Sequence, residues 1–173
     1  MIKYIGMVLI AVSCTAGGFM LSDRVKLRLK QIESFLRFFD YIIKYIDKYK
    51  YPVERIFKEY QDSDASLKNC GFLDKLLKNG RVNGVYANPW ETSLEECKTE
   101  GLIFLKDDEF EIIKEFGAKL GRGRSDDQIC HMNLHREKLG KLYEEEYVKE
   151  TNTSKLYKIS GGLVGIFLCV LMF

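Results

Sequence analysis

The sequence predicts an all-α fold: a membrane-anchored bundle of about six helices, with a transmembrane helix at each end. Two observations lead to this prediction. Both ends of the chain are apolar, and the apolar residues between them recur at helical spacing. Together they divide the chain into a first transmembrane helix at 1–21, a helical domain at 22–157 and a second transmembrane helix at 158–173.

The first apolar run extends from Ile2 to Leu21 and contains only Lys3 as a charged residue. Such a run is long enough to cross the hydrocarbon core of a bilayer. A cleaved signal peptide is the alternative, because "AVSC" resembles a lipoprotein cleavage site. The run continues past Cys14, however, and the basic cluster follows it, which favours a retained helix.

The second apolar run carries no charge from Ile159 to Phe173 and would form a helix of about 22 Å. A buried core helix would explain such a short run equally well. The apolar first run favours the membrane interpretation. Basic residues flank both runs on their inner sides: Arg24, Lys26, Arg28, Lys30, Lys149, Lys155 and Lys158. By the positive-inside rule, the middle of the chain is expected in the cytoplasm and both termini on the far side.

Small residues recur four apart within the apolar runs, which lets helix backbones approach closely in lipid. The pairs are Ser13 with Gly17, Cys14 with Gly18, and Gly161 with Gly165. They could pack the two predicted spans together or dock another membrane protein.

Composition narrows the functional classes. The formal net charge is only +2, which argues against nucleic acid as a partner. The five cysteines include no CxxC pair, so neither a disulfide framework nor a zinc ribbon is indicated.

Helical periodicity is clearest directly after the first run. One seam advances by alternating steps of four and three: Val25, Leu29, Ile32, Leu36, Phe39, Ile43 and Ile46. Further apolar residues widen it, so this helix should contact several partners: Phe35, Phe38, Ile42, Tyr45 and Tyr49. Pro52 should end it and open the next helix, "VERIFKEYQ". A short helix is expected around Leu67 to Leu77.

"KNGRVNGVYANP" contains two Asn-Gly pairs, which are typical of a hairpin or of a loop. Its flanks do not alternate like strands, so a loop is predicted. Asn88 should cap the following helix, with Pro89 at its first position and Glu91 reaching back. Trp90 is interpreted as a core anchor rather than as a platform for a ligand.

Two more helices complete the prediction. One covers about Lys106 to Leu120, and a long charged helix runs from Asp126 into the terminal run, with Ser125 and Gln128 matching a capping box. Since both long helices would leave the membrane together, Pro52 and the turn from Gly121 to Ser125 should meet at the tip farthest from the bilayer.

Motifs with catalytic or metal-binding chemistry are weak. His131 and His135 have the spacing of two zinc ligands, but Met132 stands where the metalloprotease signature needs Glu. A solvated polar face is the preferred interpretation. "GAKLGRGRS" is glycine-rich and basic, yet it lacks the lysine of a P-loop, so a sharp turn is preferred over a nucleotide site. No catalytic residue, metal ligand or cofactor is predicted, and the protein is not expected to be an enzyme.

The sequence as a whole resembles the stage III sporulation protein AB family. The resemblance is carried, in order, by "TAGGFML", "RLKQIESFLRFFDYIIKYIDKYKYPVERIF", "WETSLEE", "FEIIKEFGAKLG" with Gln128 seven residues after Gly121, and "LYKISGGLVGIFLCVLMF".

This resemblance implies a membrane scaffold of the sporulation channel between mother cell and forespore. It implies a location in the mother-cell membrane around the forespore, and a domain similar to the platform domain of type II secretion and type IV pilus systems. The implied partners are a cytoplasmic ATPase, stage III sporulation protein AA, and other membrane proteins of the stage III sporulation A operon. A general secretion or pilus platform protein is the alternative, and a membrane-anchored signalling domain a further one.

The chain departs from the family pattern at the predicted tip, where Gly123 and Arg124 replace a small residue and Asp. An acidic tip contact therefore cannot be carried over. Arg122, Arg124, Ser125 and Asp126 are instead predicted as an ATPase-facing patch.

Overall fold

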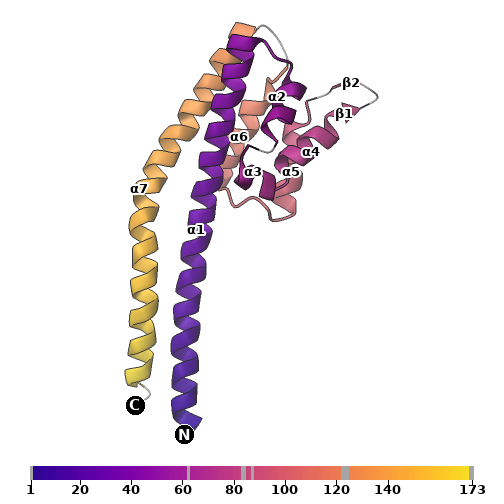
Figure 1. Cartoon of the computed structure of the whole chain (residues 1–173). Coiled ribbons are helices and arrows are strands. Elements are labelled where there is room, and N and C mark those ends of the chain that lie inside the picture. The colour runs from indigo at the N-terminus through magenta and orange to yellow at the C-terminus, as the bar shows by residue number, and fades with distance from the viewer. Residues whose placement is uncertain (1, 62, 83–84, 87, 122–124, 172–173) are drawn as a thin grey trace. The chain divides into compact units, whose positions relative to one another are not determined.

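The structure is a computed structural model of the whole chain. It describes the backbone of residues 2–61, 63–82, 85–86, 88–121 and 125–171, and the side chains of 23–61, 63–80, 88–121 and 126–149. Within these residues the chain forms helices and one short hairpin (Figure 1). In chain order they are α1 (Ile2–Tyr49), α2 (Val53–Tyr60), α3 (Ala65–Asn69), α4 (Phe72–Asn79), β1 (Arg81–Val82), β2 (Val85–Tyr86), α5 (Trp90–Thr99), α6 (Asp107–Ala118) and α7 (Ser125–Leu171).

The chain divides into two compact units. One consists of Met1–Leu27 and Glu145–Phe173, and the other of Arg28–Glu144. Among the described side chains, the buried apolar ones all belong to the second unit, from Leu29 to Leu139. The predicted domain limits, after residues 21 and 157, stay a prediction.

The predicted transmembrane helices need correction. Among the described residues no helix is both long and apolar enough to cross a membrane. The membrane-anchored bundle was therefore wrong as a fold class, although the all-α part of that prediction is confirmed. The physical reason is that charged side chains such as Arg24 and Lys26 interrupt the described part of α1, as Glu144 and Lys149 do in α7. The side chains of the two apolar runs lie outside the described residues.

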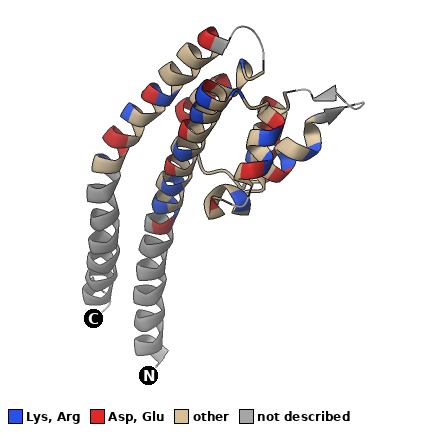
Figure 2. Ribbon diagram, turned by 45° about the horizontal axis from the view of Figure 1, so that its top comes forward, with Lys and Arg blue, Asp and Glu red and all other residues tan. Residues whose placement is uncertain are grey.

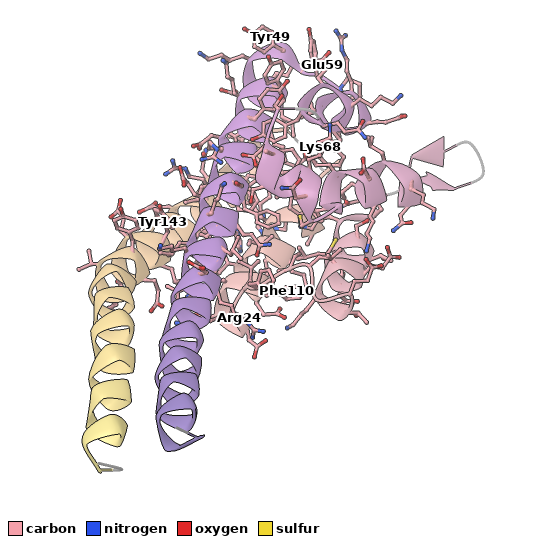
Figure 3. The ribbon with its side chains drawn as sticks, turned by 60° about the horizontal axis from the view of Figure 1, so that its bottom comes forward. Arg24, Tyr49, Glu59, Lys68, Phe110 and Tyr143 are labelled. Atoms are coloured by element: carbon pink, nitrogen blue, oxygen red, sulfur yellow. The ribbon has the colours of Figure 1, made fainter. Side chains whose placement is uncertain are left out.

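The predicted apolar stripe of the first long helix is confirmed. In α1 the side chains of Phe35, Phe38, Phe39 and Ile42 are fully buried, and Ile32 joins them. The helix is buried on a face wider than a two-stranded seam, because the core side chains of α2 to α6 cover it. Tyr49 lies at its exposed end (Figure 3).

The short helix predicted around Leu67 to Leu77 is two helices. Gly71 has φ +66°, a left-handed conformation that ends α3 and precedes α4. Glycine adopts it without the steric cost that other residues incur. The fold of the described residues therefore has one helix more than predicted.

The loop predicted between α4 and α5 contains an antiparallel hairpin, in which Arg81 pairs with Tyr86 and Val82 with Val85. The prediction of a plain loop was wrong. The Asn-Gly pairs indicated the hairpin correctly, whereas the lack of alternation in the flanks did not exclude it. Strands of only two residues are too short to show an alternating pattern.

Trp90 is the centre of the core, as predicted. It is 1 % exposed, and its indole Nε1–H donates to the carbonyl of Ile113 at 2.8 Å. Aromatic rings from α1, α2, α4 and α6 surround it: Phe38, Phe39, Phe57, Phe72 and Phe116. Burial of large rings supplies much of the stability of a small domain, so this cluster holds five helices together, α5 with Trp90 and the four that surround it.

Polar side chains fix the connections around this core. Asn88 accepts a hydrogen bond from Trp90 N–H at 3.2 Å and donates to the carbonyl of Gly117 at 2.6 Å. The predicted capping contact of Asn88 is present, but the residue at the N-cap is Pro89. Pro89 is therefore not the first helical residue, and Glu91 forms an ion pair with Lys114 on α6 instead of reaching back. Gln31 of α1 donates to the carbonyl of Leu102 and accepts from the N–H of Phe104, which ties the α5–α6 connection to α1.

Candidate partner-binding surface at the end of helix α1

Two turns of the helical unit lie side by side, as the sequence predicted. A Cβ atom placed on Gly121, after α6, would lie 3.9 Å from Cγ2 of Val53, the first residue of α2. Gly121 has φ +75°, so the chain leaves α6 through a left-handed turn suited to glycine. The start of α2 and the end of the α6 segment therefore form one surface.

The end of α1 carries a backbone conformation unusual for its residue type. Lys50 has φ +52°, and it is the one non-glycine residue with a positive φ among the described residues. The N–H of the next residue, Tyr51, donates to the carbonyl of Tyr45 at 3.3 Å and closes the helix end. Glycine usually occupies such a position, since a side chain there costs about 1–2 kcal/mol. The chain retains a lysine at an exposed turn despite this cost.

Tyrosines cover the same end of α1. Ring centroids of Tyr41 and Tyr45 are 4.2 Å apart, those of Tyr45 and Tyr49 5.1 Å, and those of Tyr49 and Tyr51 5.8 Å. The ring centroid of Tyr60 of α2 lies 4.8 Å from that of Tyr41, with the rings tilted, and this contact holds the row against the core. We call Tyr41, Tyr45, Tyr49 and Tyr51 the tyrosine row. Tyr49 is 52 % exposed, so the row passes from the core to the surface.

Two phenols at this end of α1 have a raised pKa, those of Tyr41 in the row and Tyr60 beside it. Burial, together with a hydrogen bond to Tyr45, raises the pKa of Tyr41 to about 12. Burial likewise raises the pKa of Tyr60 to about 12. Both phenols therefore stay protonated at physiological pH.

Figure 2 shows Lys and Arg (blue) interspersed with Asp and Glu (red) along the described helices. Some of these cations lie beside the tyrosine row. The guanidinium of Arg55 lies 4.0 Å from the ring centroid of Tyr51, a cation–π distance, and its Nε donates to Glu59 at 2.8 Å. On α1, Lys44 and Lys48 are exposed one turn apart, and Lys44 Nζ lies 5.9 Å from the ring of Tyr45. The surface thus combines phenolic groups with cations.

The predicted ATPase-facing residues are only partly described. Arg122 and Arg124 lie outside the described residues, as does the side chain of Ser125, whose backbone begins α7. Asp126 is exposed in the first turn of that helix. The patch as a whole stays a prediction. The structure describes only the backbone at the predicted membrane-packing residues Ser13, Gly17, Gly18, Gly161 and Gly165, so their packing stays a prediction.

The histidine pair is structural rather than a solvated polar face, and that interpretation was wrong for His135. His135 is 4 % exposed, with Nδ1 2.8 Å from the carbonyl of His131 and Nε2 2.8 Å from Glu115 Oε2 on α6. Its contacts join α6 to α7. In the part of the chain that the structure describes, no three His, Cys, Asp or Glu residues are placed to hold a metal ion.

The two buried thiols, those of Cys70 and Cys97, do not form an activated site. Cys70 and Cys97 are buried, and Cys97 Sγ contacts the carbonyl of Cys70 at 3.4 Å. Burial raises the pKa of Cys97 to about 12 and raises that of Cys70 as well. A thiol with a raised pKa is a poor nucleophile, because the thiolate is the reactive form.

The structure also shows contacts of Arg28 and of the tyrosine row that the sequence analysis did not predict. Arg28, counted in the basic cluster beside the first apolar run, is 6 % exposed and forms an ion pair with the fully buried Glu109 of α6. No local pattern links two residues 81 positions apart. The tyrosine row, by contrast, has a sequence signal: Tyr41, Tyr45 and Tyr49 recur every four residues, which places them on one helix face.

Comparison with known families decides the identity. A family model described as stage III sporulation protein AB matches residues 3–173, essentially the whole chain. The chain belongs to the stage III sporulation protein AB family. The resemblance noted from the sequence is thereby confirmed, and the protein is a stage III sporulation protein. The comparisons with curated proteins and with solved structures gave no match.

Proposed function

We propose that this stage III sporulation protein AB family member is a non-enzymatic scaffold of the sporulation channel between mother cell and forespore. In this role the helical unit Arg28–Glu144 binds a cytoplasmic ATPase, stage III sporulation protein AA, and couples it to other stage III sporulation A proteins at the mother-cell membrane around the forespore. Family membership supports the sporulation role, and the surface shared by the start of α2 and Gly121 supports a scaffold.

The observation that carries the scaffold role is the juxtaposition of Val53 and Gly121. It brings a connection from the start of the unit and one from its end onto one surface, so a partner can contact both at once. Around this surface the described side chains are phenols, cations and carboxylates. A broad surface of this kind suits protein binding better than it suits catalysis, which needs a convergent polar pocket.

The test is a binding titration of the purified full chain against the sporulation ATPase of the same organism. Arg122→Glu combined with Arg124→Glu should weaken binding about tenfold or more, because two attractive charges at the contact become repulsive. Lys30→Glu with Lys78→Glu is the matched control. It changes the net charge equally on exposed residues of α1 and α4, and it should leave affinity within about threefold.

Three results would be informative. Loss of binding confined to the arginine variant supports both the partner and the contact. Equal binding by both variants keeps the ATPase as partner and excludes the two arginines from the contact. No binding by the folded full chain contradicts the coupling to this ATPase.

A further inference from the structure

The outer face of α1 contains neither Arg122 nor Arg124, the two residues of the predicted ATPase contact. Tyr41, Lys44, Tyr45, Lys48 and Tyr49 follow the spacing i, i+3, i+4, i+7, i+8, which places all five on one face of the helix. We call this set the Tyr–Lys stripe. It measures about 12 Å along the helix axis, or roughly two turns.

The stripe is accessible to a partner. Lys44 and Lys48 are exposed, Tyr49 is 52 % exposed, and Tyr41 and Tyr45 are half-buried. No ion pair to a described carboxylate holds either lysine, whereas Lys58 and Arg55 of the neighbouring α2 pair with Glu54 and Glu59. The stripe therefore keeps its charge for contacts outside the molecule.

The chemistry of the stripe narrows the class of partner. The rings of Tyr41 and Tyr45 stack at 4.2 Å and are half-buried, and Tyr45 contacts Tyr49 in a tilted arrangement at 5.1 Å, so Tyr49 is the one tyrosine of the stripe that is more than half exposed. Binding of single-stranded nucleic acid needs free aromatic faces on which bases stack. Insertion into a lipid surface needs exposed aliphatic or large aromatic side chains, and Tyr49 is the one large hydrophobic residue exposed on the described part of α1 beyond Leu27.

The exposed side chains of the stripe are those of Tyr49, Lys44 and Lys48, so it offers a partner a phenolic O–H donor and two ammonium groups. Carboxylates match both, because they accept hydrogen bonds from phenols and pair with ammonium groups. The lysines stand four residues apart, about 6 Å along the axis, which equals the spacing of Glu side chains at i and i+4 of a second helix. We propose that the Tyr–Lys stripe binds an acidic helical segment of a partner protein. This inference does not depend on the identity of the ATPase.

The probe for a test is a fluorescein-labelled synthetic helix of repeated Glu-Glu-Ala-Leu units, titrated against the full chain by fluorescence anisotropy. The wild type should bind it, with affinity that falls as salt rises. Lys44→Glu with Lys48→Glu should weaken binding about tenfold, while the control Lys30→Glu with Lys78→Glu should stay within about threefold. Both variants change the net charge equally. A difference between their affinities for the peptide therefore shows that the position of the lysines matters.

A second variant separates hydroxyl groups from ring packing. Tyr45→Phe with Tyr49→Phe keeps the stacked rings and removes two donors, so the fold should persist while binding weakens about threefold or more. Circular dichroism confirms folding of each variant. Equal losses for stripe and control variants would overturn the proposal, as would absence of binding by the wild type. Stripe-dependent binding to phosphatidylglycerol vesicles without peptide binding would also overturn it, in favour of a lipid ligand.

Discussion

The indole of Trp90 occupies the space that a side chain at position 117 would need. A Cβ atom on Gly117 would lie 2.0 Å from Cγ of Trp90, far inside any real contact distance. The same glycine's carbonyl accepts a hydrogen bond from Asn88, two residues before Trp90. The start of α5 and the last turn of α6 thus contact each other in two ways: the Trp90 indole packs against Gly117, and Asn88 binds the Gly117 carbonyl.

Gly117→Ala should therefore destabilise the protein by about 3 kcal/mol, because neither the buried indole nor the α6 backbone can move aside freely. Urea unfolding followed by circular dichroism measures the change. Gly140→Ala in α7 is the matched control: its nearest contact would be Arg136 at 3.7 Å, so the variant should gain up to about 1 kcal/mol from helix propensity. A Gly117→Ala protein as stable as the wild type would contradict this packing.

The buried pair of Arg28 and Glu109 predicts a second stability effect. Glu109 also accepts the N–H of Lys106 at 2.8 Å, which begins α6. Glu109→Leu alone should cost about 3–5 kcal/mol, because it leaves the Arg28 guanidinium buried without its carboxylate. Adding Arg28→Met should recover a large part of that loss. A double variant no more stable than Glu109→Leu alone would show that the pair is not coupled.

Lys50 predicts a stabilising substitution. Lys50→Gly should raise the free energy of unfolding by about 1 kcal/mol, since glycine adopts φ +52° without steric cost. Lys48→Gly, which removes an identical side chain inside α1, should instead lower it by about 1 kcal/mol. Chemical denaturation of the two variants checks both signs. Equal effects would mean that the helix end is not strained.

Stability should also fall with acidification around His131. Burial, and then the proximity of His135 and Lys119, lower the pKa of His131 below its usual value near 6.5, while Glu115 opposes them weakly. The unfolded chain therefore takes up this proton first. The part of the free energy of unfolding that depends on neutral His131 is fully present above about pH 6.5. It is lost as the pH falls from there toward the lowered pKa of the folded state.

His131→Gln removes this titration. Between pH 7.5 and 5.5 the wild type should thus lose more stability than the variant in thermal unfolding scans. Identical pH profiles for both proteins would rule out the effect.

Local patterns of the sequence were sufficient for most of the helices. The periodicity from Leu29 to Ile46 identified the buried face of α1, and Pro52 marked its end, because both depend on residues close together in the chain. Trp90 was identified as a core residue by its size and setting. Gly71 was overlooked, since a single glycine within an apolar pattern does not reveal a left-handed turn unless the backbone is known.

The candidate surface was harder to predict because it depends on which turns meet. The meeting of the start of α2 with Gly121 followed from the two long helices. Of the tyrosine row, however, only Tyr45 and Tyr49 were considered, as part of the apolar stripe. Hydropathy does not distinguish a tyrosine that packs inward from one whose ring stacks on its neighbour at the surface. Pairs distant in sequence, such as Arg28 with Glu109, had no local signal at all.

The most direct test of the scaffold role is the location of the ATPase in sporulating cells. A fluorescent fusion of stage III sporulation protein AA should gather at the membrane around the forespore when this protein is present, and spread through the mother cell when its gene is deleted. Restoring the wild-type protein should restore the pattern. An ATPase that still gathers at the forespore in the deletion strain would contradict the proposal that this protein couples it to the channel.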